Sequence, residues 1–259
     1  MLIAGTPEFI LFTFILMRIS GFILLNPVLG RRNLPGTAKA GFILVVSLIT
    51  FQIASGDILN LDITSPITYG LYLIKEFLVG FVLGFTMYLF DFAITFAGSV
   101  IDFQMGMTMS TVYDAQNGTQ VALTGKILQI YFLLLFFAVD GHLVLMNLIV
   151  TSADIVPYGQ IALGPEVARG VLDIFTECVS LAVKLAFPII AIEFIVEVAV
   201  GILMKMIPQI NLFILSIELR IVFGLAVLLL FISPIGSYLE GLIDNMLNTI
   251  PALLERAAG

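Results

Sequence analysis

Six long apolar segments, separated by short polar stretches and by glycine and proline, make up most of this chain. A helix needs about 20 apolar residues to cross the hydrocarbon core of a bilayer, and each segment is close to that length or longer. The pattern therefore predicts an all-α polytopic membrane protein. We expect its six long helices near Pro7–Leu25, Thr37–Ala54, Ile67–Phe90, Val121–Val139, Leu172–Met204 and Leu212–Ile232.

Several of these helices are expected to be long, kinked or extended. The apolar pattern of the third continues past Asp91 towards Phe103, and that of the fourth past His142. Pro188 is expected to kink the fifth helix, because proline removes a backbone donor and clashes with the preceding turn. Behind the sixth, Ser233–Gly259 alternates apolar and acidic residues at helical spacing, which predicts an amphipathic tail helix.

Composition supports one membrane-embedded domain over residues 1–259. Hydrophobic residues make up 60% of the chain and charged residues 11%, with a mean hydropathy of +1.15. A soluble domain would carry about 25% charged residues. The 18 acidic residues outnumber the 11 basic ones, which argues against nucleic acid as a partner because phosphate binding needs clustered bases.

Basic residues mark the odd-numbered connections between the segments. Arg31, Arg32 and Lys39 crowd the first connection, whereas the second contains Asp57 and Asp62 and no base. Because basic loops stay on the cytoplasmic side, we expect the N-terminus and the C-terminal tail to face away from the cytoplasm.

Charged side chains also lie inside the apolar segments, where each costs roughly 3 kcal/mol or more at mid-bilayer. Glu193 and Glu197 are four residues apart and project from one helical face. Four interpretations remain open. We favour ion pairs between helices inside an assembly, and the others are a proton or ion relay, the wall of a water-lined channel, and helices held partly outside the bilayer. The candidates for inter-helix or inter-subunit pairing are Arg18, Lys184, Glu193, Glu197, Glu218 and Arg220.

Enzyme motifs are scarce. The single histidine, His142, excludes a two-histidine zinc site, and no G-x-S-x-G elbow or glycine-rich phosphate loop occurs. The sequence therefore predicts no catalytic activity, no cofactor and no metal site.

Gly80 and Gly84 form a G-x-x-x-G pair in the third apolar segment. Without a Cβ at either position, a neighbouring helix backbone can approach closely. The pair therefore favours helix association.

The segment Gln104–Gln120 differs from its surroundings, because it carries alternating methionines and then a polar turn, Asp114–Gly118, between two long apolar helices. Methionine is flexible and polarizable, so such a run can seal a gap of variable shape. An ordinary re-entrant connection is the competing interpretation. The residues in question are Met105, Gly106, Met107, Met109 and Asp114.

Five stretches, in this order, resemble characteristic stretches of the FliR family of the flagellar type III export gate, whose injectisome counterpart is SctT-like. The Gln-Met-Gly and Pro-Gln-x-x-x-Phe pair is the most specific part of the resemblance. The stretches are Met17–Pro35, Gly80–Met87, Gly98–Asp114, Asp140–Leu143 and Gly201–Phe213.

The resemblance implies a subunit of a helical, pore-forming gate through which unfolded flagellar proteins pass. Its partners would be FliP-like and FliQ-like subunits and a FlhB-like switch protein, in the bacterial inner membrane at the flagellar basal body. Residues 1–160 would resemble a FliP subunit, and residues 161–259 a FliQ hairpin and tail. The segment after Gln104 would be the plug of the closed gate, and Pro208, Gln209 and Asn211 the turn of the hairpin.

Two alternatives of other classes stay open, a stand-alone secondary transporter and an intramembrane hydrolase, although the sequence offers no nucleophile and base for the hydrolase. In a stand-alone secondary transporter, Arg18, Lys184, Glu193 and Glu197 would form an ion site at the midplane. Helices interrupted at Pro188 and Pro208 suit that architecture.

Overall fold

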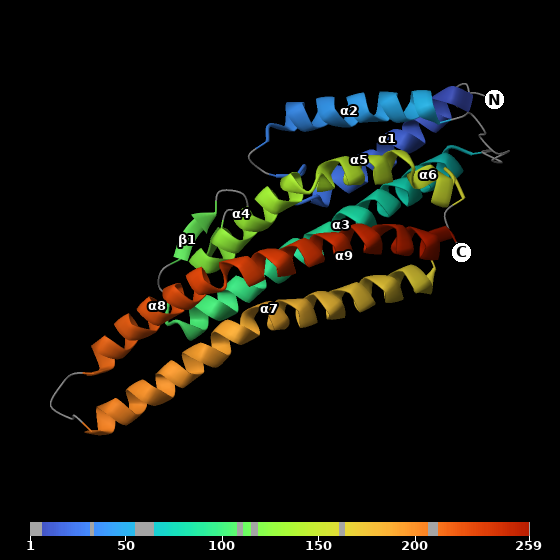
Figure 1. Cartoon of the computed structure of the whole chain (residues 1–259). Helices are drawn as coiled ribbons and strands as arrows, with labels where there is room; N and C mark the ends of the chain where they lie inside the picture. Colours follow the sequence, from blue (N-terminus) through green and yellow to red (C-terminus); the bar gives the residue numbers. More distant parts are fainter. Residues whose placement is uncertain are drawn as a thin grey trace. The chain divides into compact units, whose positions relative to one another are not determined.

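The computed structural model describes residues 7–31, 34–54, 65–107, 111–114, 119–160, 164–206 and 212–258, and nearly all of them are helical (Figure 1). The prediction of an all-α fold is confirmed. The helices are α1 Pro7–Leu25, α2 Gly36–Ile53, α3 Pro66–Gln104, α4 Leu123–Ala138, α5 Gly141–Val150, α6 Ser152–Ile155, α7 Pro165–Met206, α8 Leu212–Leu230 and α9 Ile232–Ala258.

Four of these helices (α1, α2, α3 and α7) are long and apolar enough to cross a membrane. The number rises to six if each of two bent pairs, α4 with α5 and α8 with α9, counts as one span. The third predicted segment is a single helix of 39 residues, so its expected extension past Asp91 is confirmed. Pro188 lies inside the 42-residue helix α7, and the kink expected there stays a prediction.

The fourth predicted segment does not form one straight helix. It divides into α4 and α5, which meet at 70°. Asp140 lies at the junction with φ 57°, a left-handed conformation that ends one helix and starts another. The prediction of helix past His142 is therefore right about the helical state and wrong about its direction.

A short antiparallel hairpin lies between α3 and α4, which the apolar pattern did not predict. Strand β1, Thr111–Asp114, pairs with β2, Thr119–Ala122, so that Thr111 faces Ala122 and Asp114 faces Thr119. The chain thus reverses direction between Asp114 and Thr119, within the predicted polar turn.

The chain packs as two compact units. Unit 1 comprises Met1–Leu89, Asp140–Phe175 and Asp244–Gly259, and unit 2 comprises Phe90–Val139 and Thr176–Ile243. The division at residue 160 that the family resemblance implies remains a prediction.

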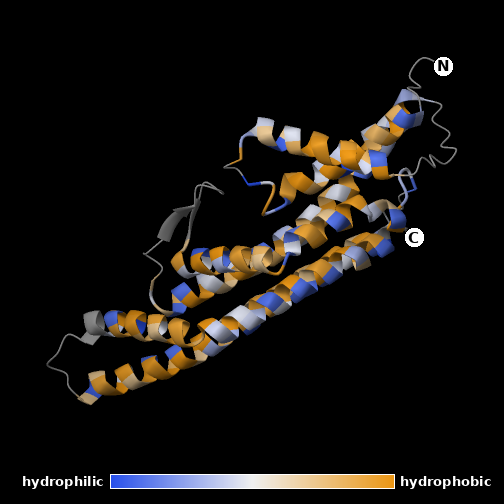
Figure 2. Ribbon diagram, turned by 45° about the horizontal axis from the view of Figure 1, so that its top comes forward, coloured by the Kyte–Doolittle hydropathy of each residue, from blue (hydrophilic) through white to orange (hydrophobic). Residues whose placement is uncertain are grey.

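Helix α9 has the amphipathic character that was expected of the tail (Figure 2). Its apolar side chains are buried at intervals of three and four residues while its acids stay outside, and this spacing places the apolar set on one helical face. The buried set includes Leu239, Leu242, Met246, Ile250 and Leu253.

In unit 1, α1 packs against α3 at very close range. A Cβ on Gly80 would overlap the carbonyl oxygen of Arg18, and one on Gly84 would overlap the carbonyl oxygen of Phe22. Gly21 of α1 approaches the backbone of α3 in the same way. Glycines on both helices thus allow the two backbones to touch, and the partner of the G-x-x-x-G pair is a helix of the same chain.

Candidate functional site

The candidate site is the α3–α4 segment, residues 104–120, together with the side chains that hold its ends in unit 2. Helix α3 ends in a glycine cap. Gly106 has φ 76°, its N–H donates to the carbonyl of Phe103 at 3.1 Å, and the N–H of Met107 donates to the carbonyl of Asp102 at 2.8 Å. These two hydrogen bonds around a left-handed glycine satisfy carbonyl groups in the last turn of the helix. Gly106 therefore has a structural role in ending α3.

The two described methionines of the segment are buried. Met105 is 0% exposed and Met107 is 7% exposed. Met105 fits against Gly224 of α8, where an added Cβ would lie 2.6 Å from its Cγ and 2.8 Å from its sulfur. The glycine thus makes room for a thioether that joins the end of α3 to α8.

The other end of the segment is held by Asp102. Its carboxylate oxygens accept the backbone N–H of Thr124 at 3.2 and 3.3 Å. Thr124 is in the first turn of α4, where N–H groups lack helical partners and the helix dipole favours a negative charge. One turn before Asp102, Gly98 lies against the backbone of Gly125. Residues 102 and 124 are therefore joined at the base of the segment.

A second polar contact joins α3 and α4. The side-chain amide of Gln129 donates to both carboxylate oxygens of Asp91, at 3.0 and 2.8 Å. Lys126 donates to the Oε1 of the same glutamine at 3.0 Å. The in-span charge at Asp91 therefore has its partners within the chain, and the two helices beneath the segment are fixed to each other.

Several predicted residues lie outside the described part of the chain. Met109 is one of them, as are the expected hairpin-turn residues Pro208, Gln209 and Asn211. Asp114 ends strand β1, and its position is described by the backbone pairing alone.

The predicted charges of unit 2 occupy α7 and α8. Arg220 Nη2 pairs with Glu197 Oε1 at 3.1 Å. Glu193 is 0% exposed. Glu218 and Lys184 are exposed on α8 and α7. The structure thus brings Glu193, Glu197 and Arg220 together in one cluster.

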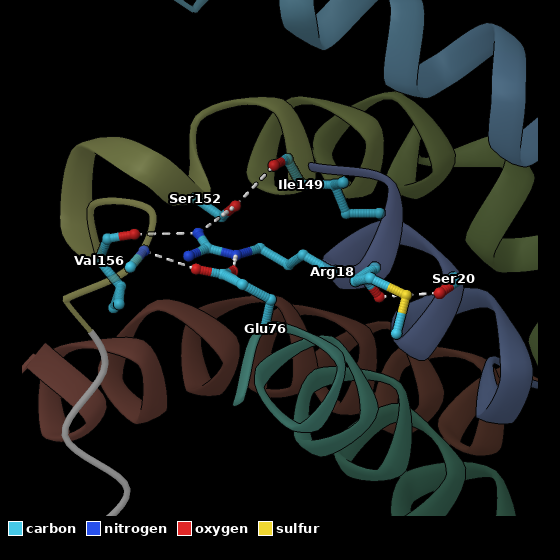
Figure 3. A network of polar contacts seen from close by, with 8 residues as sticks. Arg18, Ser20, Glu76, Ile149, Ser152 and Val156 are labelled. Atoms are coloured by element: carbon cyan, nitrogen blue, oxygen red, sulfur yellow. Dashed lines mark hydrogen bonds and ion pairs between the residues drawn. The ribbon is translucent and has the colours of Figure 1, made fainter. Parts of the chain in front are cut away.

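Arg18 lies in unit 1, in a buried network shown in Figure 3. Its Nε donates to Glu76 Oε2 at 2.8 Å, and the exposed fractions of the two side chains are 2% and 0%. Its Nη1 donates to Ser152 Oγ at 3.2 Å and to the carbonyl of Val156 at 2.9 Å. A charge on α1 is thereby tied to α3, to α6 and to the residue that follows α6.

The segment after α6 completes this network. The backbone N–H of Gly159 donates to Glu76 Oε1 at 2.8 Å, and the Arg18 guanidinium carbon lies 4.3 Å from the centroid of the Tyr158 ring. Burial raises the pKa of the Tyr158 phenol to about 12. The arginine therefore has a carboxylate, a carbonyl, a hydroxyl and an aromatic face around it.

Sequence reasoning missed the residues that anchor the site. Asp102 lies within the stretch Gly98–Asp114 that carries the family resemblance, but nothing in the sequence singled it out as an anchor, and Gly224 lies outside the five stretches. Glu76 is a charge inside the third apolar segment, but its partner 58 residues away could not be read from the pattern. In the described part of the chain, no three His, Cys, Asp or Glu side chains gather in a group that could hold a metal.

Comparison with known proteins gives consistent results. A sequence model of the family described as bacterial export proteins, family 1, matches residues 9–246. The flagellar biosynthetic protein FliR of Bacillus subtilis is 31% identical over 251 residues, which cover 96% of this chain and 95% of the relative. FliR of Escherichia coli is 28% identical, covering 92% and 90%. The surface presentation of antigens protein SpaR of Shigella sonnei is 31% identical, covering 71% and 72%.

Proposed function

The chain belongs to the FliR family of bacterial export proteins, and from this premise we propose that it is a membrane subunit of the flagellar type III export gate. The observation that carries the proposal is the family match over residues 9–246, which includes nearly every described helix. The two FliR relatives, which cover 96% and 92% of this chain, are named flagellar biosynthetic proteins, which favours a flagellar over an injectisome role. Its function would be conduction of unfolded flagellar proteins rather than catalysis.

We propose FliP-like and FliQ-like subunits as its direct partners, with a FlhB-like switch protein nearby, in the bacterial inner membrane at the flagellar basal body. The apolar surface of the chain supports extensive contact with lipid or protein. On α2, for example, Val45, Leu48 and Ile49 are 55%, 50% and 49% exposed, while the polar Ser47 and Thr50 face inward. Water is a poor neighbour for such a helix.

We further propose that the α3–α4 segment closes the gate at rest. Its two ends are fixed by the glycine cap at Gly106 and by the Asp102–Thr124 contact. A segment held at its base can move as a unit without unfolding the helices beside it. Met105 and Met107 are flexible side chains that can repack while excluding water.

Affinity purification of the tagged chain from native membranes tests the assembly proposal. We expect one discrete particle that contains the proposed partners, and we expect the chain expressed alone to be polydisperse, because its exposed apolar faces need neighbours. Deletion of the gene should abolish secretion of flagellin and motility. A monodisperse lone chain that transports a small solute in liposomes would instead support a stand-alone secondary transporter.

A further inference from the structure

The part of α7 that belongs to unit 2 lies beside α8 (Figure 1), and the two helices share a cluster of three charges. Glu193 and Glu197 occupy one face of α7, and Arg220 on α8 pairs with Glu197 at 3.1 Å. Among the described residues, Arg220 and Glu197 are the charged groups that act electrostatically on the Glu193 carboxylate. Arg220 therefore pairs with one carboxylate and lies near a second.

Glu193 is the unsatisfied member of this cluster. Its side chain is 0% exposed, and neither carboxylate oxygen receives a hydrogen bond from the described residues. The Nε–H of Arg220 is also buried and has no acceptor among the residues that the structure describes. Burying a carboxylate without a donor is costly, and so is burying a guanidinium N–H without an acceptor. Within the described part of the chain, the cluster thus contains an unpaired donor on Arg220 and an unpaired acceptor on Glu193, and the two groups carry opposite charges.

Glu197 is placed differently. Its side chain is 43% exposed, and its neighbours along α7 are exposed apolar residues: Phe194 at 61%, Ile195 at 67% and Val198 at 49%. A carboxylate on an apolar, membrane-protein surface requires a cationic or hydrogen-bonding partner once that surface is covered. Once a neighbouring subunit or lipid covers this surface, water can no longer solvate the Glu197 carboxylate.

Resting on the proposed function, we propose that Glu197 is the docking point for a lysine or arginine side chain on a helix of a neighbouring gate subunit. When that side chain binds Glu197, Arg220 transfers to Glu193. The cluster then holds two carboxylates and two cations, and Arg220 gains an acceptor where Glu193 gains a donor. Before the subunits assemble, Arg220 thus neutralises Glu197 in place of the partner's cation.

The transfer needs only a rotation of side-chain bonds. Glu193 and Glu197 are one helical turn apart, and a guanidinium presents several donors in a fork that can reach either carboxylate. Arg220 is 26% exposed, so its end is not locked in a closed core. The exchange therefore requires no shift of α7 against α8.

Three isosteric variants test the proposal in cells that make the whole apparatus and in cells that make this chain alone. Glu197→Gln removes the docking carboxylate, and Glu193→Gln removes the negative charge with which Arg220 pairs only after assembly. Glu240→Gln is the control, since Glu240 is an exposed acid on α9 in the same unit and is not one of the predicted pairing residues. The measurements are the amount of chain recovered in the purified complex and the protease resistance of the lone chain in membranes.

We expect Glu193→Gln and Glu197→Gln each to lower recovery in the complex at least about tenfold, as loss of one partner of a buried charge pair does. Glu240→Gln should leave recovery unchanged. Glu193→Gln should leave the lone chain at least as protease-resistant as the parent, because its carboxylate has no donor there to lose. The inference is overturned if Glu193→Gln assembles normally, or if it weakens the lone chain as much as the complex.

A structure of the assembled complex gives an independent test. We expect Arg220 within hydrogen-bond distance of Glu193, and a partner lysine or arginine within hydrogen-bond distance of Glu197. An Arg220–Glu197 pair that persists in the complex overturns the inference and leaves the proposed function intact. If the parent chain is recovered in no larger complex, the proposed function itself fails.

Discussion

Arg18 and Glu76 form an ion pair in which both side chains are almost completely buried, with 2.8 Å between Nε and the carboxylate oxygen. Their helices, α1 and α3, touch through their backbones one turn away at Gly80. The glycine contact brings the two helices close enough for a side-on pair, and the pair satisfies two charges that would be costly in an apolar surrounding. The ion pair between Arg18 and Glu76 therefore depends on the close packing of α1 against α3 at Gly80.

Removing one member of this pair should destabilise the protein strongly. We expect Arg18→Met to cost about 3 to 5 kcal/mol, because it leaves Glu76 buried and uncompensated. Replacing both residues by methionine should cost much less than either single change. Pulse proteolysis of membranes in urea measures the loss. Glu166→Gln is the control, since its pair with Arg169 is highly exposed and should contribute little. A double-variant cost equal to the sum of the two single costs would show that the charges do not interact.

Gly80→Ala should prevent the close approach of α1 and α3. The added methyl group would overlap the backbone carbonyl of Arg18, which cannot move without shifting its helix. We expect a large drop in folded protein recovered from membranes. Gly70→Ala in the same helix is the control, because nothing lies within 4 Å of its Cβ position. That variant should be neutral or slightly stabilising through its better helix propensity. Equal recovery of both variants would contradict the close packing.

Tyr158 should make stability depend on pH in the alkaline range. Burial raises the pKa of its phenol from 10.0 to about 12. Because the folded-state pKa is the higher one, the contribution is fully present below pH 10 and is lost as pH rises through 12. Protease resistance measured across this range should fall less steeply in Tyr158→Phe than in the parent. If protease resistance falls equally steeply with pH in both proteins, the Tyr158 phenol is exposed to water and the prediction is wrong.

The apolar pattern predicted most of the helices, because the length of a membrane span and its hydropathy are local properties of the chain. Boundaries were less accurate: α7 begins at Pro165, seven residues before the expected Leu172. The first residues of α7 include polar ones, so the apolar pattern did not extend to the start of the helix. The bend at Asp140 depends on a single left-handed residue, for which the hydropathy pattern carries no signal.

The candidate site was predictable as a segment but not as a geometry. Met105 and Gly106 could be singled out by composition, yet their roles in packing and in ending α3 arise from Gly224 and from the backbone of Asp102. The contacts of the segment with α4 and α8 join residues that are at least 22 positions apart in the sequence, as Asp102 and Thr124 are. Pairings between remote residues depend on the tertiary arrangement, which spacing along one sequence does not specify.

Asp102→Ala should loosen the α3–α4 segment. The change removes the carboxylate that accepts the Thr124 N–H, and losing such a contact at a helix start costs roughly 0.5 to 2 kcal/mol. We expect faster protease cleavage within residues 104–120 and a leak of ions through an assembled complex. Asp102→Asn keeps one acceptor oxygen and should be milder. Ser99→Ala is the control, since the Ser99 hydroxyl bonds only the carbonyl of Thr95 in its own helix. An unchanged cleavage rate in Asp102→Ala would show that this contact does not hold the segment.

Gly224→Ala should displace Met105 and weaken the seal. The new methyl group would lie 2.6 Å from the Met105 Cγ and Cε, so the thioether must leave its place against α8 while the helices remain. We expect an assembled complex that leaks ions, measured by dye-detected flux in reconstituted vesicles.

A double variant separates this effect from general damage to α8. Met105→Ala alone should leave a cavity and cost about 2 to 5 kcal/mol. Combined with Gly224→Ala, the second methyl group partly fills that cavity and has no thioether to strike, so the double variant should be more stable than Met105→Ala. Gly201→Ala, whose Cβ position is open, controls for helix propensity. If Gly224→Ala is as tight as the parent while Met105→Ala leaks, the seal depends on the methionine but not on its place against α8. If neither variant leaks, Met105 serves the packing of unit 2 alone, and the gate is closed by other residues of the segment.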